Sequence, residues 1–91
     1  MRRYRFTSRF EKSLAGLPDE AAALFEKKLS LFLEDTAHPS FRTKKIQGVR
    51  NPEIWEASLT MDYRFTFQME KDGVIVFRNI GKHSILEKKK Y

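Results

Sequence analysis

The sequence predicts an α+β domain of order β-α-α-β-β-β, with an N-terminal helical hairpin packed on an antiparallel sheet. Two patterns predict this class. Apolar residues recur at helical spacing over residues 8–35, and apolar and polar residues alternate over much of residues 54–80. The chain has 91 residues, the length of one small domain, so we expect residues 1–91 to form a single unit.

The N-terminal part predicts one short strand and two helices. Polar and aromatic residues alternate over residues 3–6, which is typical of a strand. Ser8 and Glu11 form a capping box at the start of a first helix. Pro18 suits the first position of a second helix that extends to about residue 35. The connection is short enough to predict that the two helices form a hairpin.

The second helix has an apolar stripe with one exception. Positions at helical spacing on this stripe are apolar except for Lys28. Residues 36–53 follow no sustained period and contain Pro39 and Gly48, so they predict a long loop. Long loops in small domains are often functional.

Three strands are predicted next, over residues 54–60, 63–69 and 74–80. Asp72-Gly73 supplies the hairpin turn between the last two. The tail over residues 82–91 is too short and polar to predict an element.

The alternation over residues 63–69 predicts two unlike sheet faces. Its apolar residues, covered by the second helix, are Tyr63, Phe65, Phe67 and Met69. Arg64, Thr66 and Gln68 are left on an uncovered face. Burial of Trp55 would add Glu56 and Ser58 to that face, and the last strand could offer Arg78 with Val74, Val76 and Ile80. Such a face, flanked by Lys44 and Lys45, would suit a phosphate group.

The chain is strongly basic, with 18 Lys and Arg against 12 Asp and Glu and a formal net charge of +6. The excess lies in residues 1–12, 42–50 and 82–91, and the segments between them are mildly acidic. We expect the fold to gather these three segments into one positive face. A polyanionic partner is the partner class that such a face favours.

Composition also excludes several classes. The chain has no cysteine, which excludes disulfides, a thiol nucleophile and a cysteine zinc site. The longest apolar run, residues 21–25, is far shorter than the roughly 20 residues of a membrane helix. Residues 1–6 lack the apolar core of a signal peptide, so we expect a soluble cytoplasmic protein.

The two histidines suggest different roles. His38 follows the second helix, where an imidazole could cap the helix C-terminus. His83 follows the last strand in the run Gly81-Lys82-His83-Ser84 and is a weak catalytic candidate on spacing alone.

Two stretches carry a family resemblance. The first is Ile54-Trp55-Glu56-Ala57-Ser58-Leu59-Thr60-Met61-Asp62-Tyr63-Arg64-Phe65-Thr66-Phe67, and the second is Val76-Phe77-Arg78-Asn79-Ile80-Gly81-Lys82-His83-Ser84-Ile85-Leu86. With these runs the chain resembles the RelE/ParE superfamily of type II toxin–antitoxin modules, in its RelE/YafQ-like mRNA interferase branch. The resemblance covers nearly the whole chain.

The resemblance implies a toxin that cuts mRNA on the ribosome, needs no metal or other cofactor and is neutralised by a cognate antitoxin protein. The implied partners are therefore the antitoxin, the ribosome and mRNA, with no membrane. One alternative is a ParE-like inhibitor of DNA gyrase, which would bind without cleaving RNA. Another is a catalytically degenerate member that only binds RNA through its basic surface.

The resemblance also implies roles for residues. Arg64 matches the arginine that stabilises phosphate charge, and His83 matches a terminal histidine that acts as a general acid. Asp62 matches an acidic position, and Lys45 lies with Lys44 where other members place an active-site lysine or histidine. Ser58 departs from a second histidine of YafQ-like toxins, which leaves the general base open among Lys44, Lys45, Asp62 and Glu56. The expected RNA-binding residues are Lys44, Arg42, Arg50, Arg78 and Lys82.

Overall fold

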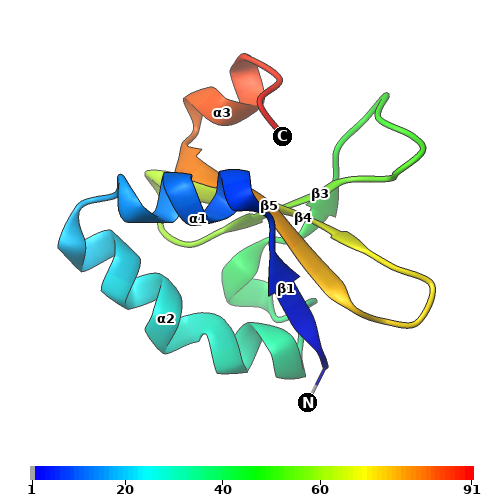
Figure 1. Ribbon diagram of the computed structural model, residues 1–91, viewed down its shortest axis with the longest axis horizontal. Helices are drawn as coiled ribbons and strands as arrows, with labels where there is room; N and C mark the ends of the chain where they lie inside the picture. Colours follow the sequence, from blue (N-terminus) through cyan, green and yellow to red (C-terminus); the bar gives the residue numbers. More distant parts are fainter. Residues whose placement is uncertain (1) are drawn as a thin grey trace.

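The computed structural model describes residues 2–91 and contains one five-stranded sheet of order β1-β5-β4-β3-β2 (Figure 1). β1 pairs in parallel with β5, and the other neighbours are antiparallel. The predicted α+β class is confirmed, with a parallel edge strand added to the antiparallel sheet. In chain order the elements are β1 (Tyr4–Phe6), α1 (Ser8–Ala15), α2 (Asp19–Glu34), the 3-10 turn η1 (Pro39–Phe41), β2 (Lys44–Lys45), β3 (Trp55–Ser58), β4 (Tyr63–Met69), β5 (Ile75–Lys82) and α3 (Ser84–Glu87).

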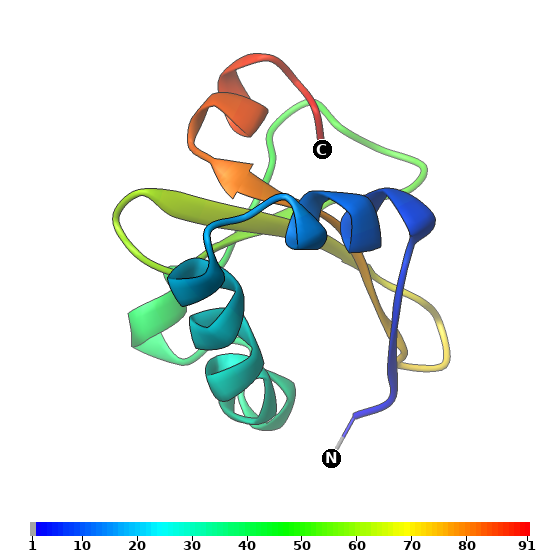
Figure 2. The same ribbon diagram turned by 60° about the vertical axis from the view of Figure 1, so that its left-hand side comes forward.

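The two N-terminal helices are confirmed, with a different first cap. Thr7, and not Ser8, is the cap of α1, because the Thr7 hydroxyl accepts a hydrogen bond from the Phe10 amide at 3.1 Å. Pro18 stands one position before α2, whose first turn carries Asp19. The helices contact each other through Phe10 and Phe25, whose ring centroids lie 5.3 Å apart, and diverge from their short connection (Figure 2).

The core is aromatic and lies between α2 and one face of the sheet, here called the core face. All eight phenylalanines of the chain pack in it or against it. Phe32 of α2 lies 5.0 Å from the rings of both Phe65 and Phe67 of β4, and Phe25 lies 5.5 Å from Phe77 of β5. Edge-to-face pairs of this kind add about 0.5–1.5 kcal/mol each to the burial of their area. The helix predicted to cover this face therefore does so.

The register of β3, β4 and β5 fixes which residues share the opposite face, here called the outer face. Arg64, Thr66 and Gln68 alternate with the buried phenylalanines of β4, as predicted. A β-bulge lies between the pairs Thr66–Asn79 and Phe67–Phe77. Because the bulge adds one residue to β5, Ile80 pairs with Phe65 and is buried on the core face, which corrects its expected outward position.

Residues 36–53 are less irregular than the sequence predicts. They contain η1 and the two-residue strand β2, which pairs with β3. Phe41 and Ile46 are both buried and anchor the segment to the core. His38 caps η1, because its Nδ1 accepts from the Ser40 amide at 3.2 Å, and the residue that closes α2 is Asp35.

The outer face is partly covered by the C-terminal segment, residues 84–91, for which the sequence predicted no element. α3 lies across the sheet from α2, and the chain returns from it over β5 (Figures 1 and 2). The Asn79 amide donates to the Lys90 carbonyl at 2.6 Å, and Thr66 and Asn79 are both buried. Within residues 2–91, none of the helices has the length and apolar character that a membrane crossing requires.

Candidate functional site at one end of the outer face

Two cross-strand rows organise the outer face. Lys44, Glu56, Thr66 and Asn79 form one row across β2, β3, β4 and β5. The next row consists of Ser58, Arg64 and Gly81. The second row lies at the end of β5 from which His83 and α3 follow, so the register brings Arg64 and His83 to the same end of the sheet.

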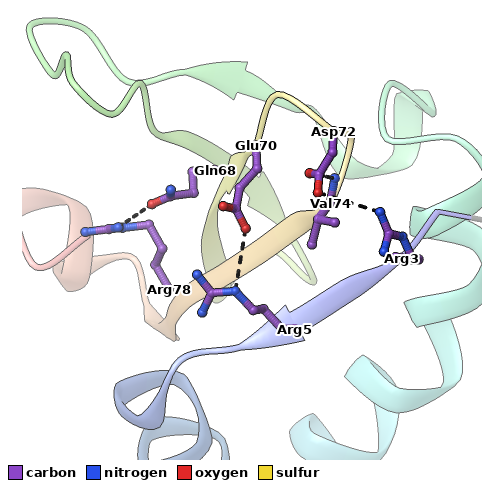
Figure 3. A network of polar contacts seen from close by, with 7 residues as sticks. All are labelled: Arg3, Arg5, Gln68, Glu70, Asp72, Val74 and Arg78. Carbon is purple, nitrogen blue, oxygen red and sulfur yellow. Dashed lines mark hydrogen bonds and ion pairs between the residues drawn. The ribbon is translucent and has the colours of Figure 1, made fainter.

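Polar contacts engage the basic side chains at the far end of the outer face. Arg3 pairs with Asp72 and Arg5 with Glu70 of the turn between β4 and β5, each at 3.6 Å, and Arg78 of β5 donates to Gln68 of β4 (Figure 3). The first two pairs are exposed ion pairs, which contribute little to stability. Their carboxylates nevertheless offset the positive charges of Arg3 and Arg5.

Arg78 is also held by the C-terminal segment. Its Nε donates to the Tyr91 carbonyl at 3.4 Å, and Arg9 of α1 donates to the same oxygen at 3.5 Å. Burial, and secondarily the positive charge of Arg9, lowers the pKa of Arg78. Arg78 was predicted to bind RNA, but its donors are directed to Gln68 and to main-chain oxygen in this structure.

His83 opens onto a shallow hollow of about 460 Å³. It is lined by Met61, Asp62, Tyr63, Lys82, His83 and Ser84. His83 immediately precedes α3, is exposed, and makes no side-chain cap for the helix, which leaves its imidazole available to a ligand. An imidazole, a carboxylate and an ammonium group therefore line one solvent-open hollow, a combination of groups that could transfer protons.

The position of His83 depends on the close packing of α3 against Gly81 of β5. Gly81 lies under α3, where an added Cβ would stand 2.8 Å from the Cγ2 atom of Ile85. Only glycine leaves room for α3 to pack directly on β5 at this point. This packing fixes where the chain leaves β5 and places His83 beside the start of β4.

Arg64 is the second residue of β4, and its guanidinium contacts the turn between β3 and β4. Its Nη1 donates to the carbonyls of Thr60 at 2.6 Å, Met61 at 2.9 Å and Tyr63 at 3.2 Å. Arg64 lines a second hollow of about 220 Å³, together with Lys28, Ser40, Arg42, Ser58, Leu59, Thr60 and Met61. Met61 lines both hollows, so the turn separates the Arg64 hollow from the His83 hollow.

The two lysines of β2 point to different sides of the sheet. Lys44 lies in the outer-face row beside Glu56. Lys45 pairs with Glu53 at 3.4 Å and lies 5.7 Å over the ring of Trp55, which belongs to the core-face row. Lys45 and Arg50 line a third hollow with Glu53, away from both His83 and Arg64.

The structure thus gathers only part of the predicted site. Asp62, Lys82 and His83 line one hollow, and Arg42 and Arg64 line its neighbour. Lys28 is a basic residue of the second hollow that the sequence did not assign to a site; its one signal was a charged residue on the apolar stripe of α2. Within residues 2–91, no three His, Asp or Glu side chains gather in a way that could hold a metal ion.

Comparison with known proteins gives no match at the level of sequence families. No protein-family model matches the chain, and no curated protein matches it in sequence. Solved structures do match along nearly its whole length. YafQ from E. coli strain BL21(DE3) superposes with a TM-score of 0.73 at 14% identity, over 94% of this chain and 98% of that one.

Two RelE structures also match this chain along most of its length. A chain of the archaeal RelE–RelB complex from Pyrococcus horikoshii OT3 gives a TM-score of 0.71 at 23% identity, over 89% of this chain and 93% of its own. A mutant of the E. coli toxin RelE in the free state gives 0.71 at 22% identity, over 98% and 90%. The chain has a RelE-like fold. The sequence resemblance is therefore confirmed at the level of the RelE/YafQ toxin fold.

Proposed function

We propose that this protein is the toxin of a type II toxin–antitoxin module and that it cleaves mRNA on the ribosome without a metal ion. One observation carries the proposal: His83 and Asp62 line one hollow at the end of β4 and β5, where Arg64 pairs with Gly81. The RelE-like fold supports it, because the matched structures include the E. coli toxin RelE and an archaeal RelE–RelB complex.

RNA supplies its own nucleophile, which limits what the protein must provide. The 2′-hydroxyl attacks the adjacent phosphorus, its proton passes to a base, and the bond to the 5′-oxygen breaks as that oxygen takes a proton. The products are a 2′,3′-cyclic phosphate and a 5′-hydroxyl. A positioned acid or base contributes about 10²–10⁴-fold to such a reaction.

The residues of the His83 hollow can take these parts. His83 donates the proton to the leaving 5′-oxygen, and the carboxylate of Asp62 accepts the proton of the 2′-hydroxyl. Among the bases that the sequence left open, Asp62 is favoured because it alone lines the hollow of His83, whereas Lys45 is engaged with Glu53 and Trp55.

Negative charge on the phosphorane is stabilised by cations beside the hollow. Lys82 lines it, and Arg64 has Nε and Nη2 donors that make no protein hydrogen bond within residues 2–91. Fixed cations directed at developing charge often give the largest single contribution to catalysis. Because the hollow is open to solvent and has few groups, ribosomal RNA would complete the substrate's position, which accounts for dependence on the ribosome.

The test compares wild type with His83→Ala and Asp62→Asn, each induced in cells, with mapping of the 5′ ends of mRNA and their terminal groups. Wild type should produce new 5′-hydroxyl ends in register with codons, and each variant should lower their number by about 10²-fold or more. His38→Asn is the matched control. It alters the other histidine but keeps a side chain that can cap η1, so cleavage should be unchanged.

Growth arrest with intact mRNA and gyrase-linked DNA breaks would support the ParE-like alternative instead. Absence of both arrest and cleavage would support the RNA-binding alternative. Antitoxin neutralisation is tested by co-expressing a small protein encoded beside this one, which should suppress the new mRNA ends.

A further inference from the structure

The Arg64 hollow gathers basic side chains from three separate parts of the chain. Lys28 comes from α2, Arg42 follows η1, and Arg64 lies on β4. Three hydroxyl residues, Ser40, Ser58 and Thr60, line the same hollow, and no carboxylate does. The charges are therefore left uncompensated where they converge, unlike those of Arg3 and Arg5 at the far end of the outer face.

Hydrogen bonds to main-chain carbonyls hold two of these cations, Lys28 and Arg64, in place. Lys28 Nζ donates to the Leu59 carbonyl at 3.3 Å, and Arg64 Nη1 donates to three carbonyls of the same turn. Lys28 retains further N–H groups, and so does Arg64 on Nε and Nη2. The contacts orient both groups and leave donors for a ligand, as a preorganised anion site requires.

Arg42 completes the set without any such engagement. Among the contacts of residues 2–91, its guanidinium makes no hydrogen bond or ion pair with the protein, and the residue is exposed. Its backbone has φ 47°, a left-handed conformation that turns the chain directly after η1. Arginine offers a planar fork of donors that matches phosphate oxygens.

The volume of the Arg64 hollow indicates the size of the ligand group that it can hold. The hollow measures about 220 Å³, which is below the roughly 300–1,000 Å³ of pockets that enclose whole small molecules. It is suited to a phosphate group more than to a nucleotide. Met61 lines both this hollow and the His83 hollow, so the two hollows are neighbours on the surface.

We propose that Lys28 and Arg42 form a phosphate-binding subsite for an RNA strand, which holds the phosphodiester next to the one that is cleaved, with Arg64 between the two phosphates. This assignment rests on the proposed function for its choice of RNA. It gives Lys28 a reason to interrupt the apolar stripe of α2, because the residue is half-buried and its ammonium reaches the turn that borders the hollow.

The experiment measures binding of a fluorescein-labelled, ten-nucleotide single-stranded RNA to the purified protein by anisotropy, at several salt concentrations. The variants are Lys28→Met, which keeps an apolar stem without the charge, and Arg42→Gln. The control is Lys27→Met, at the neighbouring exposed position of α2 outside the hollow. Thermal melting by circular dichroism verifies that each variant is folded.

Lys28→Met and Arg42→Gln should each weaken RNA binding by about tenfold at 50 mM salt. Each should also lower the slope of log K against log salt by about 0.7, the value for one phosphate contact on a single strand. If both side chains share one phosphate, the double variant should lose less than the sum of the two. Lys27→Met should leave affinity and slope unchanged.

The proposal is overturned if folded Lys28→Met and Arg42→Gln bind with the wild-type slope, if Lys27→Met has the same effect as they do, or if wild type shows no RNA binding at 50 mM salt. Its failure is separable from that of the proposed function. Binding that depends on Lys28 and Arg42 without any mRNA cleavage would retain the subsite and remove the nuclease. Cleavage by wild type with indifferent variants would do the reverse.

Discussion

Asn79 is the residue whose replacement tests how the C-terminal segment is attached. Its side chain accepts from the Ser13 hydroxyl at 2.7 Å and from the Ile80 amide at 2.9 Å, and donates to the Lys90 carbonyl at 2.6 Å. It is only 4% exposed. One amide group therefore joins α1, β5 and the tail, and Asn79→Ala should loosen all three together.

The magnitude follows from the number of bonds. A hydrogen bond contributes about 1 kcal/mol net to stability, so the loss of three should cost about 3 kcal/mol. For a domain of this size each kcal/mol lowers the melting temperature by about 4–8 °C, which gives a fall of about 12–24 °C for Asn79→Ala. Ser13→Ala removes one of these bonds and should cost about 1 kcal/mol, or about 4–8 °C.

The assay combines urea unfolding and thermal melting with hydrogen exchange. The Lys90 amide donates to the Ile85 carbonyl at 2.7 Å and reports whether the tail is closed. In Asn79→Ala this amide should exchange faster because its segment has lost its anchor, whereas in Ser13→Ala it should keep its protection.

Two results would refute this reasoning. One is an equal loss of stability in both variants, which would mean that the bonds to Ile80 and Lys90 contribute nothing. The other is unchanged exchange at Lys90 in Asn79→Ala, which would mean that the tail is held by other contacts.

Gly81→Ala should displace α3 through the contact with Ile85 and lower the yield of new mRNA ends by about 10–100-fold. The double variant Gly81→Ala with Ile85→Ala should recover much of that yield, and no recovery would refute the steric explanation. Thr66→Val removes a buried hydroxyl that has no hydrogen-bond partner among residues 2–91, so urea unfolding should show a gain of up to about 1 kcal/mol, and a loss of that size would contradict the expectation. Thr7→Ala should cost about 1 kcal/mol by the loss of the α1 cap, whereas Ser8→Ala should change thermal stability by less than about 0.5 kcal/mol; the reverse order would restore Ser8 as the cap.

The elements that sequence predicts well are those with a long internal period. β4 matches its predicted bounds, residues 63–69, because seven residues of strict alternation leave one reading. β2 and η1 were missed because two or three residues carry no period, and their geometry comes from pairing with β3 and from burial of Phe41. α3 was missed for the same reason, since its stability comes from packing on Gly81.

In the candidate site, too, the sequence predicts the features that follow from strand alternation and misses those that depend on tertiary contacts. Arg64 and His83 fall at one end of the sheet because strand alternation and chain order already place them there. Lys44 and Lys45 lie on different faces because of the register of the two-residue strand β2, which the sequence does not reveal. Arg78 donates to Gln68 and Tyr91, and the sequence gives no sign of either contact. Lys28 joins the site only through the fold, because it lies 36 positions before Arg64 in the chain.

The two borders of the sheet restrict how another polypeptide could associate with it. β1 has three residues and β2 has two, and both carry basic side chains. Short, charged edge strands offer few unpaired amide and carbonyl groups. Addition of a strand from a neighbouring chain is therefore disfavoured, and so is self-aggregation. A protein that binds this molecule would therefore recognise it mainly through side chains on its surfaces, and only weakly by adding a strand.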